Sequence, residues 1–372
     1  MSKPKYLYID DESVAAVEAV RDGFNDANLI EVTVEEPQDF KTQKELFKEK
    51  LKYFDGVILD LRLDQNMQLD VSYNAPAIAQ ELRMSVSTGE KYLKSCPIIL
   101  CSTDDKMRAT YDVDKTSHDL FDYKFLKGSE PNYLKFSKKL CSLAEGYKWL
   151  NIKYRTAPEI FGRIDTNKID PRIIERFADD EQKLKANEIA LFIIKEMFHH
   201  PGALIKERLV AARLGINIEE SGKSWDELRD KFLFKAKYSG LFNSGWDRWW
   251  MDIINTFFKE STDGIRLSTI NADERVALLS QCLGIKGLIA AKPIKYCKST
   301  NFWTICEGYK SPLDPLEGFR VFETVDIKPW QEAKYISFMA AEVERLNRDR
   351  GLRPHPSEKN RIQSIKESFY EK

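Results

Sequence analysis

The chain has 372 residues, of which 42% are hydrophobic and 31% charged, and its formal net charge at pH 7 is −1. These values are typical of a soluble globular protein and exclude a disordered or fibrous chain, and they show none of the basic excess of many nucleic-acid-binding domains. No apolar run approaches the ~20 residues of a membrane-spanning helix, and acids from position 10 onward interrupt any signal-peptide core, so we expect a cytoplasmic protein.

The first 150 residues alternate short apolar runs with segments of helical spacing. In chain order the strand-like runs are KYLYI (5–9), LIEVTVE (29–35), GVILD (56–60), PIILC (97–101) and YKFLK (123–127). Helical patterns lie between them, and a last helix is expected from about 131 to 147. This alternation predicts an α/β domain over residues 1–148, with a doubly wound, parallel five-stranded sheet.

Helical patterns dominate after Trp149. We interpret residues 149–170 as a linker or a docking segment, which would be a short strand carrying Ile152, Tyr154 and Phe161. Residues 171–372 are predicted to form a mostly α-helical second domain of unknown type. Within it, a long helix is expected from 330 to 351, because its amphipathic pattern ends at a glycine followed by two prolines.

Polar residues stand where four of the five predicted strands end. Asp10 and Asp11 follow the first strand, Asp60 ends the third, Ser102 follows the fourth and Lys127 ends the fifth. In an open parallel sheet, ligands bind beyond the carboxyl ends of the strands. We therefore expect these side chains to gather at one edge of the sheet.

Three carboxylates at one edge repel each other unless a cation lies among them. A hard divalent ion such as Mg²⁺ suits oxygen ligands and leaves room for a phosphoryl group. Asp60 could then attack phosphorus as a carboxylate nucleophile, while Lys127 neutralises phosphate charge and the Ser102 hydroxyl bonds a phosphoryl oxygen. The alternative for each acid is a solvated loop residue with no chemical role.

The stretches YIDDES, VILDLRLD, PIILCST and FLKGS, in this order and each at a strand end, resemble the response-regulator receiver domain, which has a flavodoxin-like fold. The resemblance ends near residue 145. It implies that Asp60 is the phosphoacceptor, that Ser102 is the switch hydroxyl and that Lys127 pairs with the phosphate. It also implies a sensor histidine kinase as partner, and a Mg²⁺ site formed by Asp10, Asp11, Asp60 and the backbone carbonyl of Arg62.

The sequence departs from the receiver pattern at positions that couple phosphorylation to a conformational change. Asp64 stands where receivers usually carry a proline, Gly128 replaces the proline after the lysine, and Lys124 occupies the position of the switch aromatic residue. The interval from Asp60 to Ser102 is also longer than expected for the family. These departures leave two alternatives open: a receiver that is phosphorylated, and a degenerate receiver that only binds partners.

The C-terminal half contains no recognised catalytic motif and no phosphate-binding loop. We expect it to be an output domain that binds a partner protein, for which the aromatic-rich stretch GWDRWWMDIINTFF offers either core residues or a binding face. The segment 205–235 is similar to a helix-turn-helix, so a DNA-binding transcription regulator is one alternative. An effector enzyme of a bacterial defence system, with an unrecognised C-terminal active site, is the other.

Overall fold

The computed structural model describes residues 2–66, 69–88, 94–103, 107, 115–128, 131–152, 154–178, 184–323, 325–346 and 351–370. The chain divides into two compact units. The first comprises residues 1–164, 172–194 and 240–246, and the second comprises residues 165–171, 195–239 and 247–372. The first unit thus includes two segments that the sequence pattern assigned to the helical second half.

A five-stranded, all-parallel sheet forms the centre of the first unit, which confirms the predicted sheet. The order β2-β1-β3-β4-β5 is one of the common orders of doubly wound sheets. The strands lie close to the predicted runs. Their bounds are β1 Lys5–Ile9, β2 Glu31–Glu35, β3 Gly56–Asp60, β4 Ile98–Thr103 and β5 Tyr123–Lys127.

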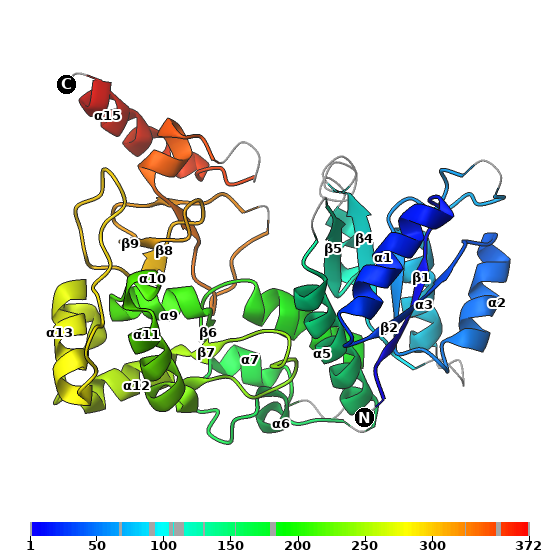
Figure 1. Cartoon of the computed structure of the whole chain (residues 1–372), viewed down its shortest axis with the longest axis horizontal. Coiled ribbons are helices and arrows are strands. Elements are labelled where there is room, and N and C mark those ends of the chain that lie inside the picture. Colours follow the sequence, from blue (N-terminus) through cyan, green and yellow to red (C-terminus); the bar gives the residue numbers. More distant parts are fainter. Residues whose placement is uncertain are drawn as a thin grey trace. The chain divides into compact units, whose positions relative to one another are not determined.

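Helices cover both faces of this sheet (Figure 1). Helices α1 (Val14–Asp26) and α5 (Tyr133–Ile152) pack together on one face. Helices α2 (Phe40–Lys50) and α3 (Ala75–Ser87) pack together on the other face. A 3-10 helix, Lys115–Leu120, precedes β5. Connections of this kind let each parallel strand begin at the same edge of the sheet, so that all five carboxyl ends lie at the opposite edge.

The strands are buried on both faces, as expected for a parallel sheet covered by helices. Alternate residues such as Leu7, Val57 and Leu100 pack with Phe47 of α2 and Ile78 of α3. The other face is rich in aromatic side chains. Its ring pairs, with centroids 4.9 Å and 4.7 Å apart, are Phe24–Phe125 and Phe125–Phe136.

One acid, Asp122, is buried at the amino-terminal end of β5. It accepts hydrogen bonds from the Arg83 guanidinium (2.8 Å), the Ile98 amide (2.8 Å) and the Tyr147 hydroxyl (2.6 Å). These three hydrogen bonds hold the carboxylate in place and join α3, β4 and α5 to the start of β5. Asp122 is therefore a structural acid, at the edge opposite to the strand ends that carry the predicted site.

Residues 149–170 contain helical structure instead of the docking strand considered from the sequence. Helix α5 continues to Ile152, and the short helix α6 (Ala157–Phe161) begins with a capping box formed by Thr156 and Glu159. Ile160 and Phe161 of α6 are fully buried. Within this range the residues that the structure describes include no strand.

The rest of the chain combines helices with two-residue strand pairs. The strand pairs are β6 Leu204–Ile205 with β7 Trp249–Trp250, β8 Thr304–Ile305 with β9 Pro312–Leu313, and β10 Phe319–Arg320 with β11 Tyr335–Ile336. The helices are α7 Pro171–Glu175, α8 Ala186–Leu191, α9 Glu207–Leu214, α10 Ile218–Ser221, α11 Lys223–Glu227, α12 Met251–Ser261, α13 Ala272–Leu283 and α15 Lys359–Tyr370.

Short turns of other helix types connect these elements. They are π-helical at Phe192–Phe198, Leu228–Phe232 and Met339–Val343. They are of 3-10 type at Phe234–Ala236, Leu267–Thr269 and Pro356–Glu358.

The predicted long helix over residues 330–351 is wrong. Tyr335 and Ile336 form β11, and among the residues described there only 338–343 are helical. The reason is a non-local pairing: β11 runs antiparallel to β10, with Phe319 opposite Ile336. β-branched and aromatic residues such as those of β11 favour strands once a partner strand is present.

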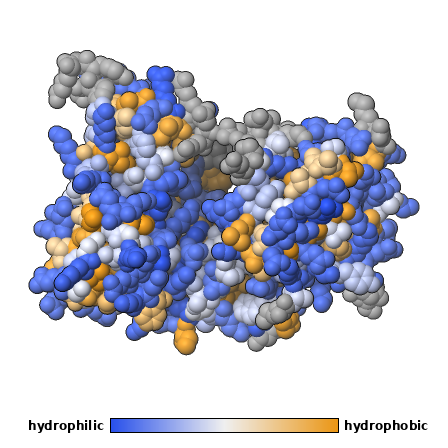
Figure 2. Space-filling view, in the orientation of Figure 1, coloured by the Kyte–Doolittle hydropathy of each residue, from blue (hydrophilic) through white to orange (hydrophobic). Residues whose placement is uncertain are grey.

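The surface seen in Figure 2 is mostly hydrophilic, with hydrophobic residues in small separate groups. This distribution agrees with the high content of charged residues. Among the described residues, no helix has the length and apolar character needed to cross a membrane.

Candidate functional site

Three aspartates meet at the carboxyl ends of β1 and β3. Asp10 and Asp11 follow β1, and Asp60 is the last residue of β3; since β1 and β3 are neighbouring strands, the two ends lie side by side. One carboxylate oxygen of each lies within 4.8 Å of the other two, and all three residues are buried. The sequence predicted this gathering, and the structure contains it.

Backbone and side-chain donors hold each carboxylate in place. Asp10 accepts hydrogen bonds from the Tyr8 hydroxyl and the Glu12 amide (2.9 Å). Asp60 accepts one from the Arg62 amide (2.9 Å). Asp11 turns toward the loop after β3.

That loop supplies both donors to Asp11. The amides of Gln65 and Asn66 donate to Oδ2 of Asp11 at 2.7 Å and 3.0 Å. The loop after β3 is thereby fastened to the end of β1. These bonds leave other carboxylate lone pairs available, since each ionised carboxylate can accept about four hydrogen bonds or metal contacts.

Lys127, the last residue of β5, reaches across β4 to the aspartates. Its Nζ lies 2.7 Å from Asp10 Oδ2, 2.7 Å from Asp60 Oδ1 and 3.2 Å from Glu12 Oε2. Only 10% of its side chain is exposed. Because these groups are largely buried, water and salt screen the two ion pairs of Lys127 with Asp10 and Asp60 only weakly.

The charges of the site are not balanced. Burial raises the pKa of Asp60 to about 6, because the Asp10 charge adds to burial and Lys127 only partly offsets them. Burial lowers the pKa of Lys127, but the surrounding Cys101, Asp60 and Asp10 outweigh it and raise the pKa overall. Counted by formal charge, the three aspartates and Lys127 together carry a net charge of −2, which is the charge that one divalent cation neutralises.

Ser102 lies at the carboxyl end of β4, between the strands that carry Asp60 and Lys127. Its neighbour Cys101 pairs with Asp60, and Ser102 itself pairs with Leu126, next to Lys127. The Ser102 side chain is completely buried, and its hydroxyl has no hydrogen-bond partner among the described residues. A buried hydroxyl without a partner is costly unless a ligand or water satisfies it.

The Arg62 side chain pairs with Asp64 at 3.0 Å. The predicted role of the Arg62 carbonyl as a metal ligand stays a prediction.

Lys124, in the switch position, is exposed, whereas the neighbouring Phe125 is buried among aromatic residues on the α1–α5 face. The loop after Ser102, where we expect a conformational response, lies mostly outside the described residues.

Two residues of the site, Tyr8 and Glu12, were not predicted from the sequence. Tyr8 lies two positions before Asp10 in β1, so that strand alternation places both on the same side, and its hydroxyl donates to Asp10. Glu12 lies beside Lys127. The period of two in β1 could have identified Tyr8, but no local signal marks Glu12, because its partner is 115 residues away in sequence.

The arrangement fits a cation. The donors are carboxylate oxygens, which hard divalent ions prefer, they lie within 4.8 Å of each other, and their charge is uncompensated. Beside this site lie the Lys127 ammonium and the Ser102 hydroxyl, which has no partner in the described part of the chain, so the site can also receive an anionic group bound to the cation.

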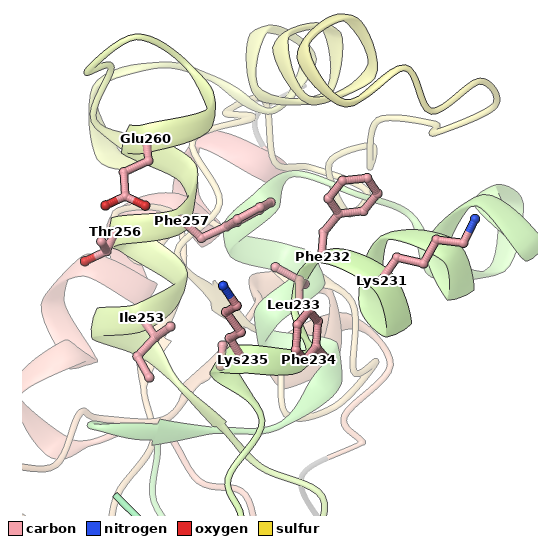
Figure 3. A pocket seen from close by; sticks show the side chains of 10 residues that line it. Lys231, Phe232, Leu233, Phe234, Lys235, Ile253, Thr256, Phe257 and Glu260 are labelled. Carbon is pink, nitrogen blue, oxygen red and sulfur yellow. The ribbon is translucent and has the colours of Figure 1, made fainter. Parts of the chain in front are cut away.

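A separate pocket of about 300 Å³ lies in the second unit, between α12 and the turns of residues 228–236 (Figure 3). Phe232, Leu233, Phe234, Ile253 and Phe257 give it an apolar lining, and Lys231, Lys235, Ala236, Thr256 and Glu260 complete it. Phe234 is 56% exposed. In Figure 3 the amine of Lys235 points into the space between α12 and the opposite turns.

The segment 205–235 contains the helices α9, α10 and α11, but its arginines form ion pairs with carboxylates of the protein. Arg208 pairs with Glu219 at 2.9 Å, and Arg213 is buried and paired with Glu332. Arg229 contacts three carboxylates, which belong to Glu207, Asp226 and Asp230. The arginines of this segment therefore offer little free positive charge to DNA phosphates, whereas Lys206 and Lys235 make no ion pair among the described residues; DNA binding through the segment stays a prediction.

Comparison with protein-family models gives no match for this chain, and no curated protein matches it. The geometry of the site and the order of the strands are accordingly the basis for assigning a function.

Proposed function

We propose that the protein is a response-regulator-like signalling protein in which Asp60 accepts a phosphoryl group in a Mg²⁺ site. The observation that carries this proposal is the meeting of Asp10, Asp11 and Asp60 with Lys127 at the carboxyl ends of a sheet ordered β2-β1-β3-β4-β5. Receivers, which the sequence resembles, use the same residue types at the same strand ends.

Mg²⁺ is the proposed ion because the ligands are all oxygens and few in number. Mg²⁺ keeps several waters and binds through one or two carboxylates together with phosphate oxygens. When bound, the ion would supply positive charge to the phosphoryl oxygens. Asp10 and Asp11 would hold it, with Asp60 and the Arg62 carbonyl as the remaining protein ligands.

The protein groups have distinct roles in the transfer. An oxygen of Asp60 forms a bond to phosphorus, while the bond from phosphorus to the donor breaks and its electron pair leaves with the donor. Burial raises the pKa of Asp60 to about 6, which still leaves this carboxylate mostly ionised at pH 7, so that no general base is required.

Lys127 and Ser102 stabilise the product. Lys127 already lies 2.7 Å from Asp60 and can shift to a phosphoryl oxygen that carries more charge. The hydroxyl of Ser102, which has no partner among the described residues, can donate to another phosphoryl oxygen. The phosphate donor would be a sensor histidine kinase in the cytoplasm, as the resemblance implies.

The output would be a protein interaction in the C-terminal half. The pocket around Phe234 suits an apolar side chain of a partner, because three phenylalanines line it. Lys235 has no ion pair among the described residues, so an acidic residue beside that apolar side chain would add charge complementarity. A partner segment that places a Leu or Phe next to Asp or Glu meets both requirements.

Phosphorylation can be tested with acetyl phosphate and Mg²⁺, followed by the mass of the intact protein. We expect one added phosphoryl group in the wild type and none with the Asp60→Asn variant or after chelation of the metal. Asp64→Asn is the matched control, since Asp64 follows on the same loop but pairs with Arg62 at the surface. An adduct on Asp60→Asn equal to that of the wild type would refute the proposal.

A further inference from the structure

A group of cationic side chains lies in the second unit, around the strand pair β6–β7. In this antiparallel pair Leu204 lies opposite Trp250 and Ile205 opposite Trp249. Lys206 follows β6 and Arg248 precedes β7, so two cations flank the same end of this short strand pair. Like charges held close to each other repel, so this placement needs a physical reason.

Arg248 is buried, with only 8% of its surface exposed. Its guanidinium donates to the carbonyls of Asp247 (2.7 Å) and Phe198 (2.9 Å). Of its other donors, Nε is buried and has no hydrogen-bond partner among the described residues. Neither Arg248 nor Lys206 has a carboxylate within ion-pair distance in the part of the chain that the structure describes.

A third cation, Lys334, belongs to the same group. Backbone hydrogen bonds bring its segment to residues 201–202, where Gly202 bridges to Gln331 and the Glu332 amide donates to Pro201. Lys334 Nζ lies 2.7 Å from Glu323 and 3.4 Å from His200 Nε2, and His200 contacts the same Glu323 oxygen at 2.8 Å. The other nitrogen of His200 is buried without a partner among the described residues.

The neighbouring cations affect the pKa of Lys206. The side chain of Lys206 is accessible to solvent, yet the protein packed around it and the charges of Arg248, Lys310 and Lys334 lower its pKa. Glu307 opposes this effect but pairs with Lys310. Glu323 contacts Lys334 and His200, so Lys206 and Arg248 have no ion-pair partner among the described residues, and the group carries an excess of positive charge.

We propose that Lys206, Arg248 and Lys334, together with His200, bind the phosphate group of a small molecule. This site is separate from the aspartates of the first unit and does not depend on their phosphorylation. A bound anion would relieve the repulsion between Lys206 and Arg248 and would accept hydrogen bonds from donors that have no partner in the described structure.

Phosphate suits the site better than a carboxylate does. Four cations, Lys206, Arg248, Lys310 and Lys334, stand against two carboxylates, Glu307 and Glu323, which leaves an excess of two positive charges that a phosphate dianion matches. A phosphate also has three or more oxygens with which to contact donors from separate segments. The shared chemistry is that of inorganic phosphate and of nucleotides, and the choice between them depends on whether a base or sugar adds contacts.

Titration calorimetry on the full chain tests the proposal, with inorganic phosphate, pyrophosphate and ADP as separate probes and no Mg²⁺ present. We expect saturable binding of at least one probe at one site. The Lys206→Met variant should bind about tenfold more weakly, as expected for the loss of one charge-assisted hydrogen bond. Tighter binding of ADP than of pyrophosphate would identify a nucleotide site, and equal binding a phosphate or pyrophosphate site; both support the proposal.

Two controls distinguish a binding role from a structural one. Lys206→Arg keeps the charge and should restore binding, and Lys259→Met removes an exposed lysine of α12 and should leave binding unchanged. Thermal unfolding should show that Lys206→Met is no less stable than the wild type, because it removes a repulsion. Wild-type affinity in Lys206→Met, or binding of an oligonucleotide without binding of any small phosphate, would overturn the proposal.

Discussion

Lys127 Nζ and Asp60 Oδ1 lie 2.7 Å apart, although β4 separates the strands that carry them. This pair joins the ends of β3 and β5 over the end of β4, directly where Ser102 lies. Any group that binds to Asp60 must therefore approach Lys127 and Ser102 as well. The ion pair thus defines both the position of the site and the charge that a ligand meets there.

Loss of the Lys127 charge should destabilise the metal-free protein. Lys127→Met leaves Asp10 and Asp60 buried without their cation, and breaking a buried ion pair in this way costs about 3 kcal/mol or more. Because a divalent cation can replace the missing charge, the loss of stability should be smaller in Mg²⁺. Urea unfolding with and without Mg²⁺ measures both effects.

Lys124→Met provides the control, since Lys124 lies on the same strand but is exposed. We expect a change within about 0.5 kcal/mol for this surface substitution. If Lys127→Met were as stable as the wild type without metal, the ion pairs of Lys127 would not contribute as argued.

Asp11→Asn should have the opposite effect and stabilise the metal-free protein by about 1 kcal/mol. Asp11 makes no ion pair among the described residues, and an asparagine oxygen can still accept from Gln65 and Asn66. The substitution thus removes repulsion and keeps the hydrogen bonds. The stabilisation that Mg²⁺ confers should fall at the same time, which thermal unfolding over a Mg²⁺ series would show. A destabilised Asp11→Asn variant would mean that its carboxylate has a structural role.

Asp122 is a buried acid that we expect to stabilise the fold without binding a metal. Its three donors satisfy it without a ligand, so Asp122→Ala should destabilise the protein by about 3–5 kcal/mol with or without Mg²⁺. Urea unfolding would detect this loss. A Mg²⁺-dependent rescue of Asp122→Ala would contradict the assignment of Asp122 as structural and Asp11 as functional.

The sequence predicted the sheet and the meeting of the aspartates because both depend on local signals. Each strand is a short apolar run, and parallel topology then brings Asp10, Asp60 and Lys127 to one edge whatever the loops contain. The contacts of Glu12 and of the Gln65 and Asn66 amides could not be predicted. They depend on loop conformations that no residue pattern specifies.

The C-terminal half was harder to predict because its strands are only two residues long. Tyr335 and Ile336 lie in a pattern that is helical by spacing, but pairing with Phe319 and Arg320 determines their conformation. The placement of Lys206 and Arg248 at the same end of β6–β7 likewise follows from strand pairing. Local periodicity contains no information on which distant residues pair.

Glu323 should make stability depend on pH in acid. Burial alone would raise the pKa of Glu323, but hydrogen bonds from His200 and Lys334 outweigh it and lower the pKa from 4.5 to about 2. A carboxyl group of lowered pKa contributes stability above its ordinary pKa and loses it as the pH falls toward the folded value. Glu323→Gln should therefore be less stable than the wild type at pH 7.

The difference between the two proteins should shrink as the pH falls from 4.5 toward 2, because the wild type loses the contribution of Glu323 in this range. Urea unfolding at several pH values would show this convergence. Glu260→Gln, at an exposed position, should show a constant and small difference. Parallel stability curves for Glu323→Gln and the wild type would contradict the account.

The most direct test of the central claim is to locate the phosphoryl group in the chain. After incubation with acetyl phosphate and Mg²⁺, borohydride reduces an aspartyl phosphate to homoserine, and peptide mass spectrometry identifies the changed position. The account predicts homoserine at position 60 in the wild type, and none when Mg²⁺ is chelated. Homoserine at another aspartate, or at none while the protein is folded and Mg²⁺ is bound, would contradict it.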